Sequence, residues 1–309
     1  SSTNRSAFQP IFVSQSEAIL SVINSQQRTR SMTDTQPTGS YVASEINTDI
    51  GKEIQRLERQ SLWGWPKESR NLALFGLSDG MRLLEVGSGP GFTTAHLLNQ
   101  YPNLHITCIE LDPILAHYAD TCLQSQNMAG RYTIIVGDLM HMPQFTEAFD
   151  FAYARFVFQH LPDPTGALHE IHRTLKPGGK LAIHDIDIGL GEIIEPTNPE
   201  AEAIENKMHA SQNQRGGNAR IGRQLWRLLQ STGYTNIDLE IVPVHTDNID
   251  FQTIFPPDWD EGAYAPQVAR NIITQQDLET LYKAHKRFQA SPDKYALFVS
   301  LMLCGQKVA

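Results

Sequence analysis

The sequence predicts an α/β protein with a doubly wound, seven-stranded, mostly parallel sheet that carries helices on both faces. From residue 81 onward, short apolar runs alternate with helical stretches, which is typical of a parallel sheet covered by helices. The expected strands lie at 81–86, 104–110, 131–136, 149–154, 179–185, about 236–245 and 295–304. The chain has 309 residues, 40% of them hydrophobic and 19% charged, so it can bury a substantial core.

Two segments precede the first strand. Residues 1–40 are rich in Ser, Thr, Gln and Asn, and we expect a flexible arm there. In residues 41–80, Ile46, Ile50, Ile54 and Leu57 recur at three- and four-residue steps, which predicts an amphipathic helix that ends near 63–66. A second short helix is expected over 67–76, so this segment predicts a helical cap on the sheet domain of residues 81–309.

The first strand runs into a glycine-rich turn, Gly87-Ser88-Gly89-Pro90-Gly91, and a helix is expected from about Thr93. Glycines let a ligand approach the backbone closely, and the start of a helix presents unpaired amides to it. A nicotinamide dinucleotide fingerprint would need a glycine at position 92, where this chain has Phe. The turn therefore predicts a ligand site and disfavours a dinucleotide.

Acidic residues follow the next two strands. Glu110 ends the second strand, where a carboxylate beside the glycine turn is placed to accept the hydroxyls of an adenosine ribose. Asp138 follows the third strand, where it can accept from an adenine amine while Leu139 packs on the ring. An Asx-type turn is the alternative interpretation of Asp138.

Farther along the chain, helix-start and helix-stop residues predict one more helix, and two segments are insertions. Asp163 and Pro164 suit the start of a helix over 164–175, and Lys176-Pro177-Gly178-Gly179 ends it before the fifth strand. Two segments exceed what a simple sheet domain needs, at about 189–218 and about 255–292.

Five motifs in sequence order resemble those of the class I, Rossmann-like S-adenosylmethionine-dependent methyltransferases. They are the glycine turn, Glu110, Gly137-Asp138, the run from Ala154 to Pro164 and the Leu175–Gly179 loop. The resemblance covers roughly residues 41–245. Within this family, the sequence is similar to the branch of ubiquinone-biosynthesis-type and natural-product enzymes that methylate small molecules. It implies S-adenosyl-L-methionine as cofactor, S-adenosyl-L-homocysteine as product, a cap at 41–80 over the cofactor, and the two insertions as a lid. By the resemblance, the methionine portion lies among Glu85, Gly87, Ser88, Gly89, Gly91 and the Arg155 backbone, the adenosine among Glu110, Leu111, Asp138 and Leu139, and the cap contributes Tyr41 and Gln60.

Methyl transfer from a sulfonium is an in-line displacement, so a protein residue need only remove a proton from the acceptor, and only when the acceptor has one to lose. The candidate bases near the ends of the fourth and fifth strands are His160, His184, Asp185 and Asp187, of which we prefer His160. Both histidines also suit a structural role, His160 at a helix entry and His184 in a buried strand. Arg155 is expected either to reach a substrate carboxylate or to form an ion pair with Asp185 or Asp187.

Composition excludes several partners. The net charge is −9 with no dense basic block, so we expect no nucleic acid. The three cysteines form no CxxC pair, and His169 and His172 lack a third ligand, so no metal is expected. Without a signal peptide or an apolar run long enough for a membrane span, we expect a cytoplasmic protein that acts on a small molecule.

Three functional hypotheses remain. The first is methyl transfer to O, N or C of a small acceptor of secondary metabolism. The second is an NAD(P)-dependent oxidoreductase on a related fold, and the third is a non-catalytic cofactor-binding scaffold. A homo-oligomer is left open.

Overall fold

A computed structural model describes residues 41–43, 47, 49–190, 192–247, 249 and 259–308. The predicted arm at 1–40, Ile46 and the first residues of the second insertion lie outside the described residues. The strands are β1 (Arg82–Val86), β2 (His105–Glu110), β3 (Tyr132–Val136), β4 (Phe149–Arg155), β5 (Leu175–Ile186), β6 (Glu192–Glu195), β7 (Tyr234–His245) and β8 (Tyr295–Lys307). The helices are α3 (Ile50–Leu62), α4 (Trp65–Phe75), α5 (Phe92–Gln100), α6 (Pro113–Ser125), the 3-10 turn η1 (Phe158–His160), α7 (Pro164–Thr174), α8 (Pro199–Gln214), α9 (Gly222–Ser231), α11 (Trp259–Ala269) and α12 (Gln275–Ala290).

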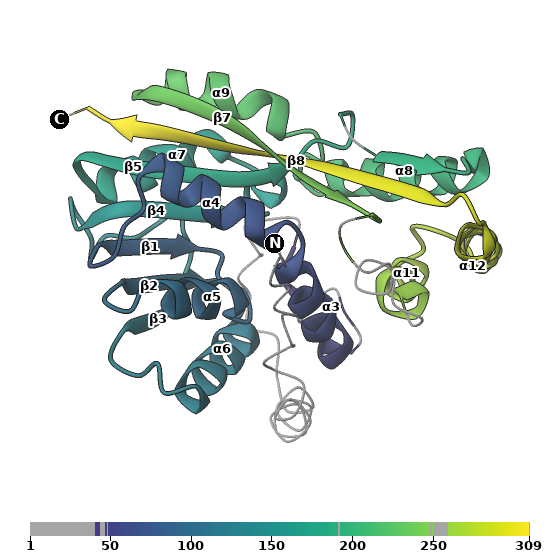
Figure 1. Cartoon of the computed structure of the whole chain (residues 1–309), viewed down its shortest axis with the longest axis horizontal. Helices are drawn as coiled ribbons and strands as arrows, with labels where there is room; N and C mark the ends of the chain where they lie inside the picture. The colour runs from purple at the N-terminus through teal and green to yellow at the C-terminus, as the bar shows by residue number, and fades with distance from the viewer. Residues whose placement is uncertain are drawn as a thin grey trace, which may run out of the picture.

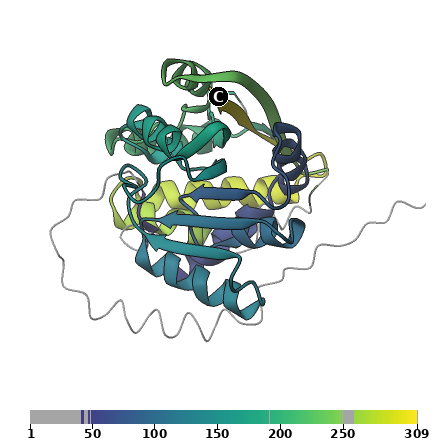
Figure 2. The same ribbon diagram turned by 90° about the vertical axis from the view of Figure 1, so that its left-hand side faces the viewer.

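The sheet confirms the predicted architecture with one added strand. Strands β3, β2, β1, β4 and β5 lie side by side in that order and are all parallel (Figures 1 and 2). The long strand β8 is antiparallel to β5, and β7 is antiparallel to the other edge of β8. The sheet has one short strand beyond the predicted seven, because the four residues of β6 also pair with β8, at Tyr295–Phe298. A segment this short gives no periodicity of its own, and it forms a strand because the end of β8 offers an unpaired edge.

The central strands are buried on both faces, which explains their continuous apolar sequence. In β1, Leu83 joins the core cluster under α3, α4, α5 and α6, whereas Leu84 joins the cluster under α7 and α9. Both side chains are fully buried. The alternation along a strand thus divides one apolar run between two cores, as a doubly wound sheet requires.

The predicted helices are present, with boundaries that shift by a few residues. Helix α3 begins at Ile50, where the Asp49 side chain accepts a hydrogen bond from the Lys52 amide. Helix α4 begins at Trp65, two residues before its predicted start. Asp163 caps α7 as expected by accepting from the Gly166 amide, but Leu175–Gly179 belongs to the long β5.

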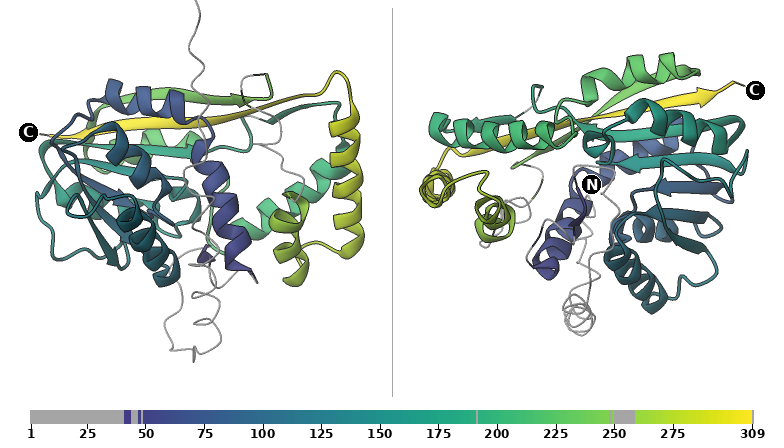
Figure 3. Two further views of the ribbon diagram at one scale, coloured as in Figure 1. Left: turned by 60° about the horizontal axis from the view of Figure 1, so that its bottom comes forward. Right: turned by 180° about the vertical axis from the view of Figure 1, so that it is seen from behind.

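The two insertions meet each other. Helix α8 of the first insertion packs with α11 and α12 of the second, around Ile204, Ile273 and Leu281. Figure 3 shows these three helices together, at the end of the molecule away from β1–β3. Among the described residues, no helix has the length and apolarity that a membrane crossing needs. The division of the chain into an arm, a cap and a sheet domain stays a prediction.

Candidate cofactor and acceptor site

The glycine turn between β1 and α5 has the left-handed backbone that its sequence predicts. The φ angles of Gly87, Gly89 and Gly91 are 66°, 56° and 80°, a region that residues with a Cβ rarely adopt. Gly91 occupies the N-terminal cap position of α5, so the turn places the first amides of that helix at the carboxyl end of β1.

The three glycines face different surroundings. A Cβ on Gly87 would lie 2.5 Å from Val157 Cγ2, and a Cβ on Gly91 would lie 2.9 Å from Ala119 Cβ, so protein packs closely against both. A Cβ on Gly89 would meet nothing within 4 Å. Gly89 therefore faces open space, and the close approach that it allows is available to a ligand.

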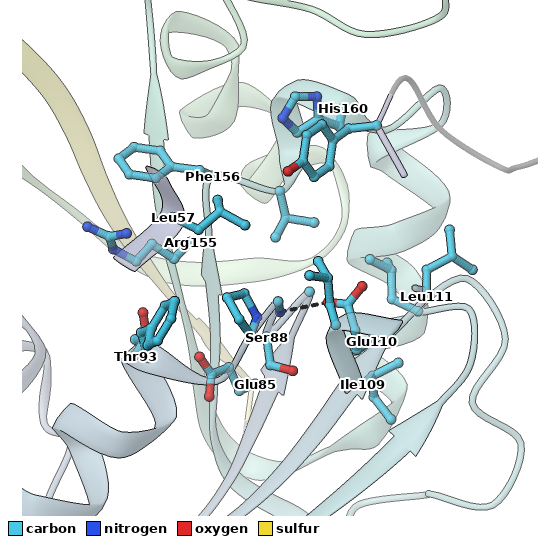
Figure 4. A pocket seen from close by; sticks show the side chains of 18 of the residues that line it. Leu57, Glu85, Ser88, Thr93, Ile109, Glu110, Leu111, Arg155, Phe156 and His160 are labelled. Carbon is cyan, nitrogen blue, oxygen red and sulfur yellow. Dashed lines mark hydrogen bonds between the residues drawn. The ribbon is translucent and has the colours of Figure 1, made fainter. Parts of the chain in front are cut away.

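Glu110 lies at the end of β2 beside this turn, and both of its carboxylate oxygens accept backbone hydrogen bonds. The Gly89 amide donates to Oε2 at 2.7 Å (Figure 4). The Asp112 amide donates to Oε1 at 2.8 Å. Each carboxylate oxygen has two lone pairs, so each retains an acceptor position. The carboxylate both fixes the glycine turn and keeps the capacity to bind two further donors.

Burial shifts the ionisation of two carboxyl groups at this site. It raises the pKa of Glu110 to about 7, against the opposing effect of the Asp112 and Gly89 amides. It also raises the pKa of Glu85 to about 7, although the Thr94 hydroxyl donates to Glu85 at 2.6 Å. Both carboxyl groups therefore change charge near neutral pH.

These elements surround a cavity of about 380 Å³ at the carboxyl ends of the parallel strands. In Figure 4, Glu85 and Glu110 lie on one side of it and His160 on the opposite side. Among the residues predicted to hold the cofactor, those lining the cavity are Tyr41, Gln60, Glu85, Gly87, Ser88, Gly89, Glu110, Leu111, Asp138, Leu139 and Arg155. The structure thus brings these positions together, and their roles toward a ligand stay predictions.

Gly91 is not among the residues that line this cavity, and its contact with the cofactor stays a prediction. A Cβ added there would lie against Ala119 of α6, so this glycine is needed for the close packing of the turn on that helix. Asp138 lines the cavity and also has the alternative role: its Oδ1 accepts from the Met140 amide at 2.9 Å, as in an Asx turn.

The N-terminal side of the cavity is held by a polar cluster from α3. The Tyr41 hydroxyl donates to Glu53, and the Arg56 guanidinium donates to the same carboxylate at 2.7 and 2.9 Å. The Tyr41 ring stacks on His160, with ring centroids 5.0 Å apart. Burial, together with Arg56 and Arg215, lowers the pKa of His160 to about 3, so its imidazole is uncharged at neutral pH.

Arg155 and His184 share a buried partner, Glu68 of α4, which sequence reasoning missed. Glu68 accepts from Arg155 Nε at 3.0 Å, from His184 Nδ1 at 3.0 Å and from the Tyr153 hydroxyl at 2.5 Å. The expected ion pair of Arg155 with Asp185 or Asp187 is wrong, because Asp187 pairs with Arg223 and Asp185 accepts backbone amides. Only the spacing of Glu68 on a predicted helix was visible in the sequence, and its partners lie 85 to 116 residues away.

These contacts change how Arg155 and His184 relate to the cavity. The Arg155 guanidinium also donates to the carbonyls of Gln60 and Trp63, so it holds the α3–α4 junction, and its contact with a substrate carboxylate stays a prediction. His184 is 1% exposed and lines neither this cavity nor its neighbour, and its role as a base stays a prediction. Both side chains are enclosed because α4 covers that face of β4 and β5.

A second chamber of about 280 Å³ adjoins the first cavity, and both are lined by Gln60, Phe156 and Ile186. Its other lining residues are mostly apolar and come from α8, β6, β7, β8, α11 and nearby loops: Trp63, Asp187, Ile188, Ile194, Glu205, Met208, His209, Val244, Tyr264, Phe298, Val299 and Ser300. Helix α8 is tied to the first cavity, because Gln212 donates to the Gln159 carbonyl at 3.2 Å. Residues of both insertions therefore line a space next to the glycine-turn cavity.

The fold and the site define a Rossmann-like α/β protein with a ligand cavity at the carboxyl ends of its parallel strands, where such proteins bind cofactors. Residues 84–183 match the family model described as a methyltransferase domain. This match to a methyltransferase domain agrees with the resemblance seen in the sequence.

Curated proteins that resemble the chain are methyltransferases. The chain is similar to a sterol 24-C-methyltransferase of Gibberella zeae, with 28% identity over 110 residues that cover 36% of this chain and 29% of that protein. It is 32% identical over 112 residues to an O-methyltransferase of Aspergillus nomiae, covering 36% and 49% of the two chains. A demethylmenaquinone methyltransferase of Lactobacillus johnsonii is 31% identical over 117 residues, covering 38% and 45%. The matched segment spans less than half the length of each of these relatives.

Solved structures share the fold at low identity. Haemonchus contortus phosphoethanolamine N-methyltransferase 2, in complex with S-adenosyl-L-methionine, gives a TM-score of 0.54 at 21% identity, covering 79% of this chain and 53% of that chain. The [4+2]-cyclase SpnF gives a TM-score of 0.50 at 16% identity, with 94% of both chains covered. Since a cyclase also has this fold, the fold by itself does not specify methyl transfer, and the reaction has to be argued from the site.

Proposed function

We propose that this protein transfers the methyl group of S-adenosyl-L-methionine to an O, N or C atom of a small acceptor and releases S-adenosyl-L-homocysteine. The observation that carries this proposal is the pair of adjoining cavities: one lies under the glycine turn and Glu110, and the other is an apolar chamber behind Phe156. A cofactor in the first and an acceptor in the second would meet at the residues that line both.

The first cavity has the hydrogen-bond acceptors, the apolar surface and the open space that an adenosyl cofactor needs. Glu110 keeps two acceptor positions for the two ribose hydroxyls, and Leu111 and Leu139 offer apolar surface for the adenine ring. The open space at Gly89 admits the ligand to the turn, and Glu85 and Ser88 line the part of the cavity nearest the helix start. When bound, the cofactor supplies an electrophilic methyl group on a sulfonium.

For an in-line displacement, the protein has to align the acceptor atom with the methyl group and exclude water from the two. The insertions that carry α8 and α11 line part of the second chamber, where they would limit the access of solvent to a bound acceptor. Its walls include Trp63, Phe156, Tyr264 and Phe298, so we infer a largely apolar, flat acceptor of the kind made in secondary metabolism. The relatives named for sterol and demethylmenaquinone methylation are consistent with this class.

Calorimetric titration of the purified chain with S-adenosylhomocysteine, and in parallel with NAD(P), tests the cofactor. Preferential binding of S-adenosylhomocysteine is expected, whereas preferential NAD(P) binding would establish the oxidoreductase hypothesis instead. Incubation with S-adenosylmethionine labelled in the methyl group and a fractionated metabolite extract then tests turnover. Binding without any transferred label would favour the scaffold hypothesis.

The Glu110→Ala variant is expected to bind S-adenosylhomocysteine more weakly by about 1–3 kcal/mol, because two charge-assisted hydrogen bonds to the ribose are lost. Calorimetry measures the difference against the unchanged chain. The exposed Glu279 on α12 provides the control, since Glu279→Ala removes the same charge far from the cavity. Equal affinity of the Glu110→Ala and Glu279→Ala variants would show that the ribose is bound elsewhere.

Affinity for S-adenosylhomocysteine is expected to rise with pH and to level off above about pH 7. The pKa of Glu110 is raised to about 7 in the free protein, and only the ionised carboxylate accepts both hydroxyls. Below pH 7 the ligand must first displace a proton, which costs up to about tenfold in affinity per pH unit. In Glu110→Gln this part of the pH dependence should disappear, and an unchanged profile in that variant would assign the effect to another group.

A further inference from the structure

Three polar side chains from separate elements form a linear chain that ends at the second chamber. The Ser300 Oγ on β8 lies 2.6 Å from His184 Nε2 on β5, and His184 Nδ1 lies 3.0 Å from Glu68 Oε2 on α4. Glu68 is completely buried and His184 is 1% exposed, so Ser300 alone among the three lines the chamber. Anything in the chamber therefore reaches the imidazole only through the serine hydroxyl.

The positions of the protons in the Ser300–His184–Glu68 hydrogen-bond series follow from which atoms accept. Burial would raise the pKa of Glu68, but Arg155 and His184 outweigh burial and lower that pKa to about 2. Glu68 is therefore an acceptor, and His184 places its single ring proton on Nδ1. Nε2 is then an acceptor that the Ser300 hydroxyl can donate to, in preference to the Val242 carbonyl at 3.3 Å.

The groups around His184 act in opposite directions on its protonation. Burial lowers the pKa of His184, so the ring is neutral in the resting protein. Glu68 favours an added charge on the ring, Arg155 opposes it, and Tyr153 and Ser300 contribute neutral hydrogen bonds within the cluster. The arrangement is that of a hydroxyl backed by an imidazole that a carboxylate orients, the pattern that makes a serine exchange its proton readily.

We propose that Ser300 is a catalytic residue of the second chamber, where its hydroxyl takes the proton of an acidic O–H on the methyl acceptor and passes its own proton to His184. This rests on the proposed methyl transfer. The acceptor oxygen forms a bond to the methyl carbon as the carbon–sulfur bond breaks, and the sulfur keeps that electron pair in S-adenosylhomocysteine. The acceptor proton moves to Ser300 Oγ, the serine proton moves to His184 Nε2, and Glu68 orients the resulting imidazolium. His184 and Glu68 act through Ser300 and are positioning residues.

The geometry favours Ser300, over the ionisable side chains that line the chamber, as the group that takes the acceptor proton. Asp187 accepts two hydrogen bonds from the Arg223 guanidinium, both at 2.6 Å, and a third from the Arg223 amide. Phe156, which lines both cavities, packs on the His184 ring with centroids 4.8 Å apart, so the relay lies directly beside the junction of the two cavities. Glu205 and His209 approach from α8 in the lid, and His209 is the rival base that the test includes.

The test uses 4-nitrophenol, a flat phenol whose ionised form is yellow, bound to the full chain loaded with S-adenosylhomocysteine. The absorbance of the bound phenol is followed against pH in the unchanged chain and in Ser300→Ala, Ser300→Thr and His209→Gln. Ser300→Ala should raise the midpoint of ionisation by about one pH unit, since the proton acceptor is lost. Ser300→Thr keeps a hydroxyl and should restore the original midpoint. The exposed Ser231 on α9 gives a matched control, because Ser231→Ala removes a hydroxyl outside the chamber.

Calorimetry with S-adenosylhomocysteine on the same variants separates this proposal from the one on which it rests. Unchanged affinity in Ser300→Ala, together with the shifted midpoint, supports the relay. A midpoint that moves in His209→Gln and stays fixed in Ser300→Ala would overturn it and assign the base to α8. Failure of 4-nitrophenol to bind the loaded chain would also overturn it, whereas failure of S-adenosylhomocysteine to bind would refute the proposed function itself.

Discussion

The Glu68→Ala variant is expected to unfold with a free energy about 3–5 kcal/mol lower than that of the unchanged chain. Glu68 is fully buried on α4 and accepts from Arg155, His184 and Tyr153, which belong to two neighbouring strands. Removing the carboxylate leaves the Arg155 guanidinium, only 9% exposed, without its counter-charge. An uncompensated buried charge costs far more than the loss of an exposed ion pair.

Urea denaturation followed by circular dichroism measures this loss, with Glu240→Ala as the control. Glu240 pairs with Lys67, the residue next to Glu68, at 2.9 Å, but both side chains are about one-third exposed. That exposed pair should contribute at most about 1 kcal/mol. Equal stability of the Glu68→Ala and Glu240→Ala variants would show that the buried cluster does not hold α4 on the sheet.

The second large effect is expected on ligand binding: Gly89→Val should weaken S-adenosylhomocysteine binding by about 3 kcal/mol, or roughly 100-fold. Gly89 has a φ of 56° and faces open space in the first cavity, so a side chain there occupies the room that the ligand needs. The substitution also strains the backbone and disturbs the amide that donates to Glu110. Calorimetry on the folded variant measures the affinity.

Gly130 provides a control that has a similar left-handed backbone but does not face the cavity. Its φ is 84°, and a Cβ there would also meet nothing within 4 Å, but it lies in the turn between α6 and β3. Gly130→Val should therefore destabilise the fold by a comparable amount and leave the affinity unchanged. If both variants lost affinity equally, backbone strain rather than occupied space would explain the effect.

Much of the cofactor cavity was predictable because its signals are local. The left-handed turn at Gly87–Gly91 needs glycine, and a carboxylate at the end of β2 must lie beside that turn in any parallel sheet of this order. The roles of single glycines were not predictable, since Gly91 packs on Ala119 and only the folded chain brings α6 there. The resemblance implied that the two insertions form a lid, but the other walls of the second chamber were not predictable, because they come from segments as distant as Trp63 and Ser300.

The sequence by itself determined the order of strands and helices, the position of the glycine turn and the acidic residue that follows it. Periodicity, capping residues and backbone conformation act over a few residues, and those few residues are enough to specify them. Only the tertiary structure decided that Glu68 is the partner of Arg155 and His184, and that Ser300 connects this buried pair to the chamber. Buried polar groups must find partners wherever the packed elements supply them, and that choice depends on which elements meet in space and not on their distance along the chain.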